Sequence, residues 1–289
     1  MSHAGGARVD GVDITQPLSA DEANALDNAL LDYGVLLFRD CAMDAAQLAA
    51  FAKHLGPIQP HVQRKYQHPQ VPEVVIMTNR NADGSFDEAG ARRGAIENIR
   101  DGWHSDLSYD PVPAKATLLH ATALPSSGGN TCFTNVTAAY RSLSDGLKRR
   151  LNGLTAEFDY GGHKRNTSAA IAANALDAKG QREAIAYHPV VNAHRANGQP
   201  GIYANPLLAS RIMELSAQES EALLERLFDT MNNEAFRWEH EWALGDTLIW
   251  DNRGGVMHCG RLDYPRDEAR RFIRTTVSGD TMVPYHFDG

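Results

Sequence analysis

The sequence predicts a mainly β protein, an all-β sandwich or barrel with α-helices attached to it. Two observations carry this prediction. Short apolar runs recur from residue 74 onward, and turns rich in Gly, Pro, Asn and Asp separate them. Three segments show the spacing of amphipathic helices, so strands outnumber helices. A chain of 289 residues can bury a large core, and we expect one domain over residues 1–289.

The three predicted helices have clear ends. The first lies between a Ser19 cap and a Gly34 stop, and the second lies between Asp44 and Gly56. The third begins after Ser216, in SAQESEALLERLFDTMNN. Ser and Asp favour the cap position because their side chains accept from the free N–H groups of the first turn. Gly favours the stop because it adopts a left-handed backbone conformation.

The remaining chain is predicted as strands and two irregular segments. The strand-like runs are VLLFR, EVVIMTN, ATLLHATAL, GNTCFTNV, AYHPVVNAH, PGIYAN, DTLIWDN and RRFIRTTVSG. Residues 80–102 and 161–184 lack strong periodicity. Long irregular segments in compact domains are often lids, so we expect both to cover a site.

Charge and composition exclude several classes of function. The formal net charge of −8 argues against non-specific nucleic-acid binding, which needs a basic surface. We find no apolar stretch long enough to span a membrane and no secretory signal at the start of the sequence. The three cysteines lie far apart without a C-x-x-C pair. These features predict a cytoplasmic protein without disulfides or a structural zinc site.

The stretch GWHSDLSY, residues 102–109, holds a histidine and an aspartate two positions apart. In an extended strand these residues point to the same face, so His104 and Asp106 could bind one metal ion. The same triplet also occurs by chance on surface strands. The spacing by itself leaves both interpretations open.

A third candidate ligand and an arginine cluster follow near the end of the chain. His258 comes after an apolar strand and a glycine pair. Arg270 and Arg274 are four residues apart in a strand-like run, which places both guanidinium groups on one sheet face. Inward-facing arginines require anionic partners, so the pair predicts two anionic ligands. Alternatively, the arginines form an exposed salt-bridge patch with Asp267 and Glu268.

Taken together, the sequence resembles the taurine dioxygenase and 2,4-dichlorophenoxyacetate dioxygenase family of Fe(II)/2-oxoglutarate-dependent oxygenases. The resemblance spans nearly the whole chain, with the similar stretches in the family's order and approximate spacing. These stretches are GVDITQPLS, YGVLLFRD, LGPI, WHSDLSY, ALPSSGGNTCFTN, YHPVV, IYAN, IWDNRGGVMH and RRFIRTT. The resemblance implies a double-stranded β-helix, or jelly roll, with flanking α-helices.

The resemblance also implies a set of functional residues. His104, Asp106 and His258 match the iron ligands, a two-histidine, one-carboxylate triad that leaves positions open on Fe(II). Arg270 matches the arginine that binds the distal carboxylate of 2-oxoglutarate, and Thr131 matches its hydroxyl partner. The implied reaction couples O₂ and 2-oxoglutarate to hydroxylation of a C–H bond and releases succinate and CO₂. Cleavage of a C–X bond or desaturation are alternative outcomes.

For the prime substrate, the resemblance implies a small anionic organic acid. Arg274 matches the arginine that holds its acidic group, and His61, Tyr160 and Tyr203 match pocket residues. Arg100 stands where taurine dioxygenase has an uncharged pocket residue, so taurine itself is not predicted. The sequence assigns no role to Arg100. It also assigns none to the arginine at position 64, which lies close to His61 in the sequence. The family favours a homodimer or homotetramer.

Two other classes of function remain open at this stage. A zinc-dependent hydrolase could use the same three ligands with a bound water. It would leave Arg270 and Thr131 without a role. A jelly-roll binding protein without catalytic activity is the other alternative, and the complete set of ligand residues argues against it. Succinate production that depends on Fe(II), 2-oxoglutarate and a substrate separates both from a dioxygenase.

Overall fold

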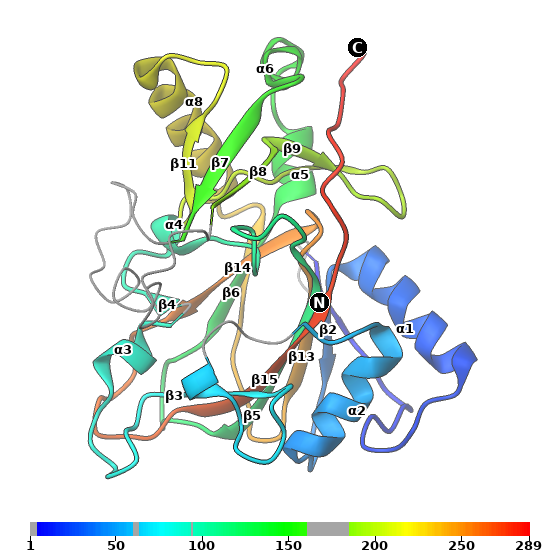
Figure 1. The fold of residues 1–289 in the computed structure, drawn as a ribbon, viewed down its shortest axis with the longest axis vertical. Coiled ribbons are helices and arrows are strands. Elements are labelled where there is room, and N and C mark those ends of the chain that lie inside the picture. Colours follow the sequence, from blue (N-terminus) through cyan, green and yellow to red (C-terminus); the bar gives the residue numbers. More distant parts are fainter. Residues whose placement is uncertain (1–4, 60–63, 94, 161–184) are drawn as a thin grey trace.

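The computed structural model describes residues 5–59, 64–93, 95–160 and 185–289. Within them the chain is mainly sheet with helices on the outside, which confirms the predicted class (Figure 1). One sheet has six strands in the order β1-β2-β13-β5-β15-β3. Its strands are β1 (Ala7–Arg8), β2 (Val35–Phe38), β13 (Thr247–Asp251), β5 (Ala114–Ala123), β15 (Arg271–Ser278) and β3 (Val75–Thr78).

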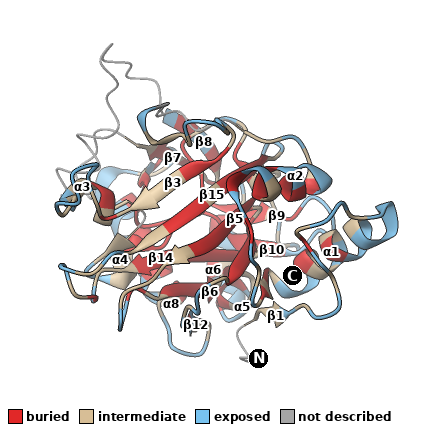
Figure 2. Cartoon of the chain, turned by 90° about the horizontal axis from the view of Figure 1, so that it is seen from below, coloured by how far each residue is buried: buried red, intermediate tan, exposed pale blue. Residues whose placement is uncertain are grey.

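A second sheet has four strands in the order β12-β6-β14-β4. These are β12 (Arg237–His240), β6 (Thr131–Asn135), β14 (Val256–Arg261) and β4 (Ala95–Ile96). The two sheets share a buried cluster that includes Phe133 of β6, Trp250 of β13 and Phe272 of β15. The Phe133 and Trp250 rings meet edge to face with centroids 5.9 Å apart. Side chains from these facing strands therefore converge in the interior. Figure 2 shows much of β5 and β15 coloured as buried.

Two helices cover the outer face of the six-stranded sheet (Figure 1). Helix α1 (Ala20–Tyr33) begins after Ser19, whose side chain forms a reciprocal capping box with Glu22. Helix α2 (Ala45–Leu55) begins after Asp44 in the same way. Both helices have the ends that the sequence predicts. Leu48 and Phe51 of α2 are fully buried against the sheet, so the apolar face of the helix completes a core.

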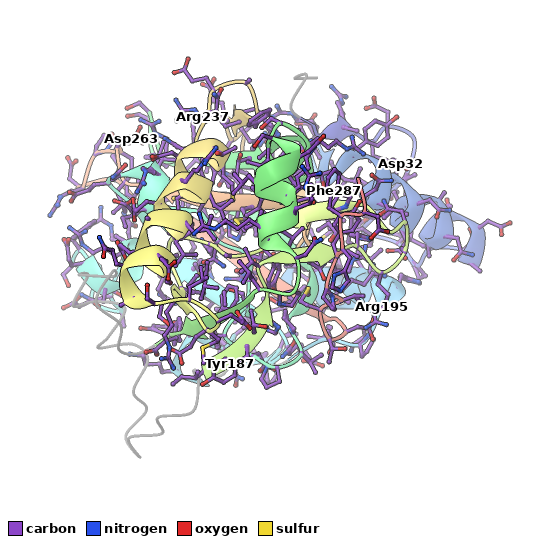
Figure 3. The ribbon with its side chains drawn as sticks, turned by 90° about the horizontal axis from the view of Figure 1, so that it is seen from above. Asp32, Tyr187, Arg195, Arg237, Asp263 and Phe287 are labelled. Carbon is purple, nitrogen blue, oxygen red and sulfur yellow. The ribbon has the colours of Figure 1, made fainter. Side chains whose placement is uncertain are left out.

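The remaining elements form a separate layer around a second core. A three-stranded sheet β11-β7-β8 and a two-stranded sheet β10-β9 belong to it. The strands are β7 (Thr155–Asp159), β8 (Ile185–Pro189), β9 (Val191–Ala193), β10 (Pro200–Ile202) and β11 (Ala209–Ile212), and the helices are α5 (Val136–Arg141), α6 (Asp145–Leu151) and α8 (Ala217–Met231). The tail passes beside α6, where Asn152 donates to the carbonyl of Phe287 (Figure 3).

The two segments predicted as irregular cover have different outcomes. Residues 80–102 carry helix α3 (Glu88–Ala91), strand β4 and helix α4 (Ile99–Gly102). Because β4 pairs in parallel with β14, the end of this segment belongs to the framework rather than to an irregular loop. Residues 161–184 lie outside the described residues. A short 3₁₀ helix, Arg64–Tyr66, precedes β3. Among the described residues, no helix has the length and apolar character needed to cross a membrane.

Candidate active site

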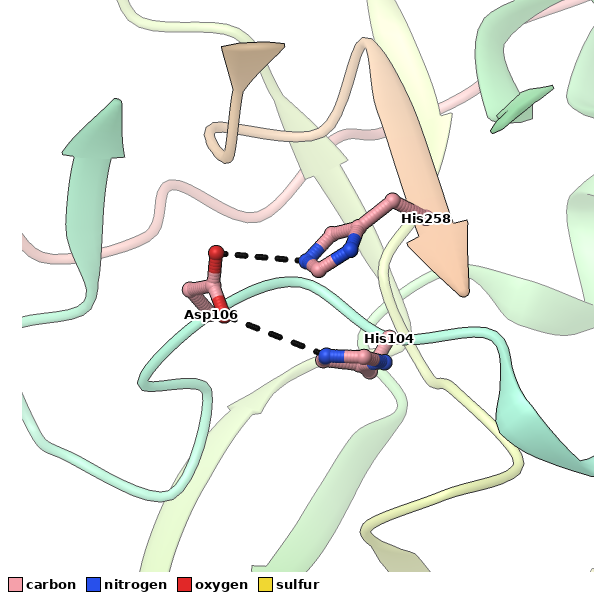
Figure 4. Close-up of side chains that lie close together, drawn as sticks. All are labelled: His104, Asp106 and His258. Atoms are coloured by element: carbon pink, nitrogen blue, oxygen red, sulfur yellow. Dashed lines mark hydrogen bonds and ion pairs between the residues drawn. The ribbon is translucent and has the colours of Figure 1, made fainter. Parts of the chain in front are cut away.

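His104, Asp106 and His258 come together in the interior, although 152 residues separate Asp106 from His258 (Figure 4). The backbones of His104 and His258 exchange two hydrogen bonds of 3.1 and 3.0 Å, forming an isolated bridge beside β14. One ligand atom from each of the three residues lies within 4.8 Å of the others. All three residues are buried. The three side chains could hold a metal ion through two imidazoles and a carboxylate.

The local backbone differs from the extended strand that the H-x-D spacing predicts. His104 makes a single bridge, and Asp106 begins a turn in which Leu107 has a positive φ of 57°. The carboxylate therefore approaches the imidazole because the chain turns, and the alternation of a strand is not the cause. A backbone hydrogen bond from Asp106 to Asn252 Oδ1, 3.0 Å long, holds this turn against the end of β13.

His104 has one ring nitrogen free for a metal. Its Nδ1 lies 2.8 Å from the carbonyl oxygen of Gly102, which can only accept, so Nδ1 carries the proton. The Nε2 lone pair then points towards Asp106 and His258. Burial lowers the pKa of His104 to about 3, and the adjacent His258 adds to this effect. The imidazole is therefore neutral at physiological pH, as metal ligation requires.

Besides His258 Nε2, which lies 3.2 Å from Oδ2, three donors hold the carboxylate of Asp106. Thr117 Oγ1 and Trp250 Nε1 donate to Oδ2 at 2.6 and 3.2 Å, and Arg274 Nη2 lies 2.7 Å from Oδ1. Burial opposes ionisation, but Arg274 and His258 outweigh it and hold the pKa of Asp106 well below its usual range. The group is therefore a carboxylate whose plane is fixed by β5 and β13.

Arg270 is partly buried and forms no ion pair with an acidic residue among the described residues. Its Nε and Nη2 donate to the carbonyl oxygen of Gly129 at 3.0 and 2.8 Å, and its guanidinium lies 4.3 Å from the centre of the Phe272 ring. Burial lowers its pKa to about 10, although Tyr264 and Asp263 oppose the effect. A partly buried cation without a counter-charge is suited to binding an anion.

Thr131 lies close to the same position. Its Oγ1 accepts a hydrogen bond of 3.1 Å from Trp242 Nε1, and the Trp242 ring packs edge-on against Phe272 with centroids 4.7 Å apart. The Arg270 guanidinium also lies over the Phe272 ring. The structure thus gathers Thr131 and Arg270 around one aromatic pair, at the start of β15, the strand that also contains Arg274.

Comparison with known proteins decides the family. The family described as "Taurine catabolism dioxygenase TauD, TfdA family" matches residues 2–276 of the chain. The chain belongs to this family. It is accordingly a 2-oxoglutarate-dependent dioxygenase, which supports one of the three classes of function that the sequence leaves open.

Relatives of the TauD, TfdA family match along nearly the whole chain. The alpha-ketoglutarate-dependent 2,4-dichlorophenoxyacetate dioxygenase of Cupriavidus pinatubonensis is 29% identical over 282 residues, which cover 96% of each chain. The (S)-phenoxypropionate/alpha-ketoglutarate-dioxygenase of Sphingobium herbicidovorans is 31% identical, with 95% of this chain and 92% of the relative covered. The crystal structure of AAD-2 in complex with Mn(II) and N-oxalylglycine matches with a TM-score of 0.81, at 26% identity and 98% coverage of both chains.

The two tyrosines that the family resemblance assigns to the substrate pocket both contact other aromatic rings. Tyr160 stacks on Tyr109 at a tilt of 32°, with ring centroids 4.3 Å apart. Tyr203 is fully buried, and its hydroxyl has no hydrogen-bond partner among the described residues. Burial raises the pKa of Tyr203, and the charge of Asp106 raises it further, which places the hydroxyl in the field of the carboxylate.

The other pocket candidates have different outcomes. His61 lies outside the described residues, and so does the side chain at position 64. Arg100 pairs with Asp229 at 2.7 Å and also with Glu225, both on α8. Its guanidinium is therefore committed to a salt-bridge cluster on the outside of the fold. Arg100 occupies no pocket position.

Sequence reasoning missed the residues that support the triad. Thr117 pairs with Trp250 across β5 and β13, and both donate to Asp106. Asn252 donates to Thr117 Oγ1 at 3.0 Å and completes the network. Trp250 and Asn252 lie in the stretch IWDNRGGVMH, so that resemblance was a signal for them. Thr117 had none, because its place depends on the register between two strands.

Proposed function

We propose that the protein is an Fe(II)-dependent dioxygenase that uses 2-oxoglutarate and O₂ to hydroxylate a C–H bond of a small anionic organic acid. The proposal includes release of succinate and CO₂. The observation that carries it is a buried His-Asp-His cluster together with Arg270, a partly buried arginine that forms no ion pair among the described residues. A zinc hydrolase needs the first feature but has no use for the second.

His104, Asp106 and His258 would hold the iron. Their donor set fits Fe(II), because two neutral imidazoles and one carboxylate are the ligands of non-haem iron oxygenases. The hydrogen bonds from Thr117 and Trp250 orient the carboxylate before any ion arrives. Iron bound there with 2-oxoglutarate would supply the oxidising power for C–H hydroxylation. The protein's own part is to bind, orient and keep water out.

Arg270 and Thr131 would hold the distal carboxylate of 2-oxoglutarate. The guanidinium already lies between the carbonyl of Gly129 and the Phe272 ring, so a carboxylate would supply its missing counter-charge. The Thr131 hydroxyl now accepts from Trp242 and can donate its own proton to the same carboxylate. These two residues would set the orientation of the co-substrate relative to the metal ligands.

Arg274 would bind the acidic group of the prime substrate. It now neutralises Asp106, and a metal ion bound by Asp106 would take over that role and leave the guanidinium for another anion. Tyr160 and Tyr203 would line the space for the organic body, and His61 would add a donor. We assign hydroxylation as the primary event, with C–X cleavage or desaturation as alternatives for particular substrates.

We extend the proposal to the architecture and the cellular context. The facing sheets would form the double-stranded β-helix, or jelly roll, of one domain over residues 1–289. Residues 161–184 would act as a lid, together with the part of residues 80–102 that precedes β4. The protein would work in the cytoplasm as a homodimer or homotetramer, without nucleic-acid or membrane partners. The net charge of −8 supports the absence of nucleic-acid binding.

A substrate panel read by O₂ uptake and succinate release tests the function. The panel comprises sulfonates, aryloxyacids, phosphonates and N-substituted amino acids, each with Fe(II) and 2-oxoglutarate. We expect at least one class to give succinate in proportion to O₂, and His258→Ala to give none. Arg274→Ala should lose substrate-coupled turnover while its affinity for 2-oxoglutarate stays close to that of the wild type. Hydrolysis of an ester or amide with Zn²⁺ and without O₂ would refute the proposal.

A further inference from the structure

Arg93 is a second arginine at the strand pair β3–β15, which contains Arg274, and the family resemblance does not cover it. It lies between α3 and β4, and its guanidinium stands 3.5 Å from the centre of the Tyr66 ring. Its Nη1 is 3.5 Å from the carbonyl oxygen of Ile76. Its Nε is buried and has no hydrogen-bond partner among the described residues. The side chain is thus held by stacking on Tyr66, and its Nε–H donates no hydrogen bond among the described residues.

The charge of Arg93 is not neutralised by an ion pair within the described part of the chain. The neighbouring Arg92 differs, because it pairs with Glu88 at 2.7 Å and Glu97 at 3.1 Å. Burial lowers the pKa of Arg93, Tyr66 and Asp87 oppose this, and the positive charge of Arg274 lowers it further. The geometry agrees, because Arg93 reaches the carbonyl of Ile76 in β3, the neighbour of Val75, which pairs with Arg274 across β3 and β15.

A count of formal charges shows what these two arginines require. In the loaded enzyme of the proposed function, the positive charges of Fe(II) and Arg270 would be balanced by negative charges. These are the single charge of Asp106 and the two charges of 2-oxoglutarate. A metal ion held by Asp106 would then replace Arg274 as the partner of that carboxylate. The charges of Arg93 and Arg274 would remain, and partly buried cations are costly unless anions pair with them.

We propose that Arg93 and Arg274 together bind a doubly charged head group, a phosphonate or phosphate monoester, on the prime substrate. Three terminal oxygens can accept from two guanidinium groups at once, whereas a carboxylate has only two. The stacked Tyr109 and Tyr160 rings offer a surface for an aromatic or apolar body. This inference rests on the proposed function, because the charge of Arg274 becomes available only when a metal occupies the triad.

Benzylphosphonate and benzylsulfonate form a matched pair for the test. They share the same body, and they carry two charges and one charge at a pH where the phosphonate is doubly ionised. Each is titrated by anaerobic calorimetry into protein loaded with Fe(II) and 2-oxoglutarate. We expect the wild type to bind the phosphonate at least about 10-fold more tightly, as one additional charge-assisted contact predicts.

Variants then test whether Arg93 causes the preference for the phosphonate over the sulfonate. Arg93→Met should weaken phosphonate binding by about 10- to 100-fold and bring the two affinities together, because one of two cations is lost. Arg93→Lys keeps the charge and should restore part of the preference even if the methionine variant folds poorly. Arg92→Met is the matched control, since its own guanidinium already has two carboxylates, and it should keep the wild-type ratio.

The outcomes separate this inference from the proposed function. The visible absorption band of the Fe(II)–2-oxoglutarate complex is recorded before each titration. A missing band contradicts the proposed function, and the charge count with it. With a normal band, equal affinities, tighter sulfonate binding or no phosphonate binding overturn the dianion inference alone. An unchanged phosphonate preference in Arg93→Met overturns the role of Arg93.

Discussion

Replacing Thr117 by valine tests whether the network around Asp106 prepares the metal site. Valine keeps the shape of threonine and removes only the hydroxyl. That hydroxyl donates to Asp106 Oδ2 at 2.6 Å and accepts from Asn252 at 3.0 Å. A hydrogen bond to a charged group contributes roughly 1.5–3 kcal/mol. We therefore expect the metal-free protein to lose about 2–3 kcal/mol of unfolding free energy, measured by denaturant titration.

The same substitution should weaken metal binding. Asp106 keeps Trp250 Nε1 at 3.2 Å as a donor to Oδ2, so the carboxylate stays in place but is less firmly oriented. Loss of such a supporting hydrogen bond typically lowers metal affinity by about 10- to 100-fold. Trp250 reports on binding, because its ring centre lies 4.5 Å from that of His258. An anaerobic Fe(II) titration followed by tryptophan fluorescence measures the change.

Thr122→Val is the matched control. Thr122 lies on the same strand, β5, and its hydroxyl donates to the carbonyl of Arg271 at 3.0 Å, away from the triad. This variant should lose stability but keep the wild-type Fe(II) affinity. If Thr117→Val binds Fe(II) within about twofold of the wild type, the carboxylate does not depend on the network, and the reasoning from β5 and β13 is wrong.

Four further substitutions have distinct expected results. His258→Ala should abolish Fe(II) binding in a folded protein, and wild-type iron content after dialysis would contradict the ligand assignment. Arg270→Gln should raise the 2-oxoglutarate concentration needed for half-maximal activity by roughly 100-fold, because the charge-assisted contact with the distal carboxylate of 2-oxoglutarate is lost. Arg271→Gln should have little effect. If instead Arg271→Gln raised the 2-oxoglutarate requirement and Arg270→Gln did not, the side chain of Arg271 would be the one that faces the co-substrate. Arg100→Ala should change the melting temperature slightly and no Michaelis constant, because its cluster with α8 lies outside the pocket.

Local sequence signals determined the elements whose causes are local. Ser19 and Asp44 start α1 and α2, and Gly34 ends α1 with a positive φ of 72°. Ser216 starts α8 with the same capping box. In each case one side chain satisfies free N–H groups within its own turn, so no distant residue is involved. The apolar runs of β5, β13 and β15 were predictable for a similar reason, because buried strands require them.

Short elements escaped prediction because their stability comes from partners distant in the sequence. Strand β4 has two residues and forms only by pairing with β14. Helices α5 and α6 are short and were not predicted, and α5 begins where Asn135 caps it directly after β6. Isolated helices of this length are unstable in water, so packing decides them. The turn at Asp106 likewise depends on Asn252, which the spacing of H-x-D cannot reveal.

The sequence by itself determined the predominance of strands, the ends of three helices and, through ordered motifs, the family with His104, Asp106, His258 and Arg270 as candidates. Only the tertiary structure decided how charges pair. It turned Arg100 outward to α8, left Arg270 and Arg93 without acidic partners among the described residues, and joined Arg274 to Asp106. The physical reason is that the cost of a buried charge depends on which groups surround it in space. Spacing along a chain records the local geometry of a strand or helix, but it does not record those neighbours.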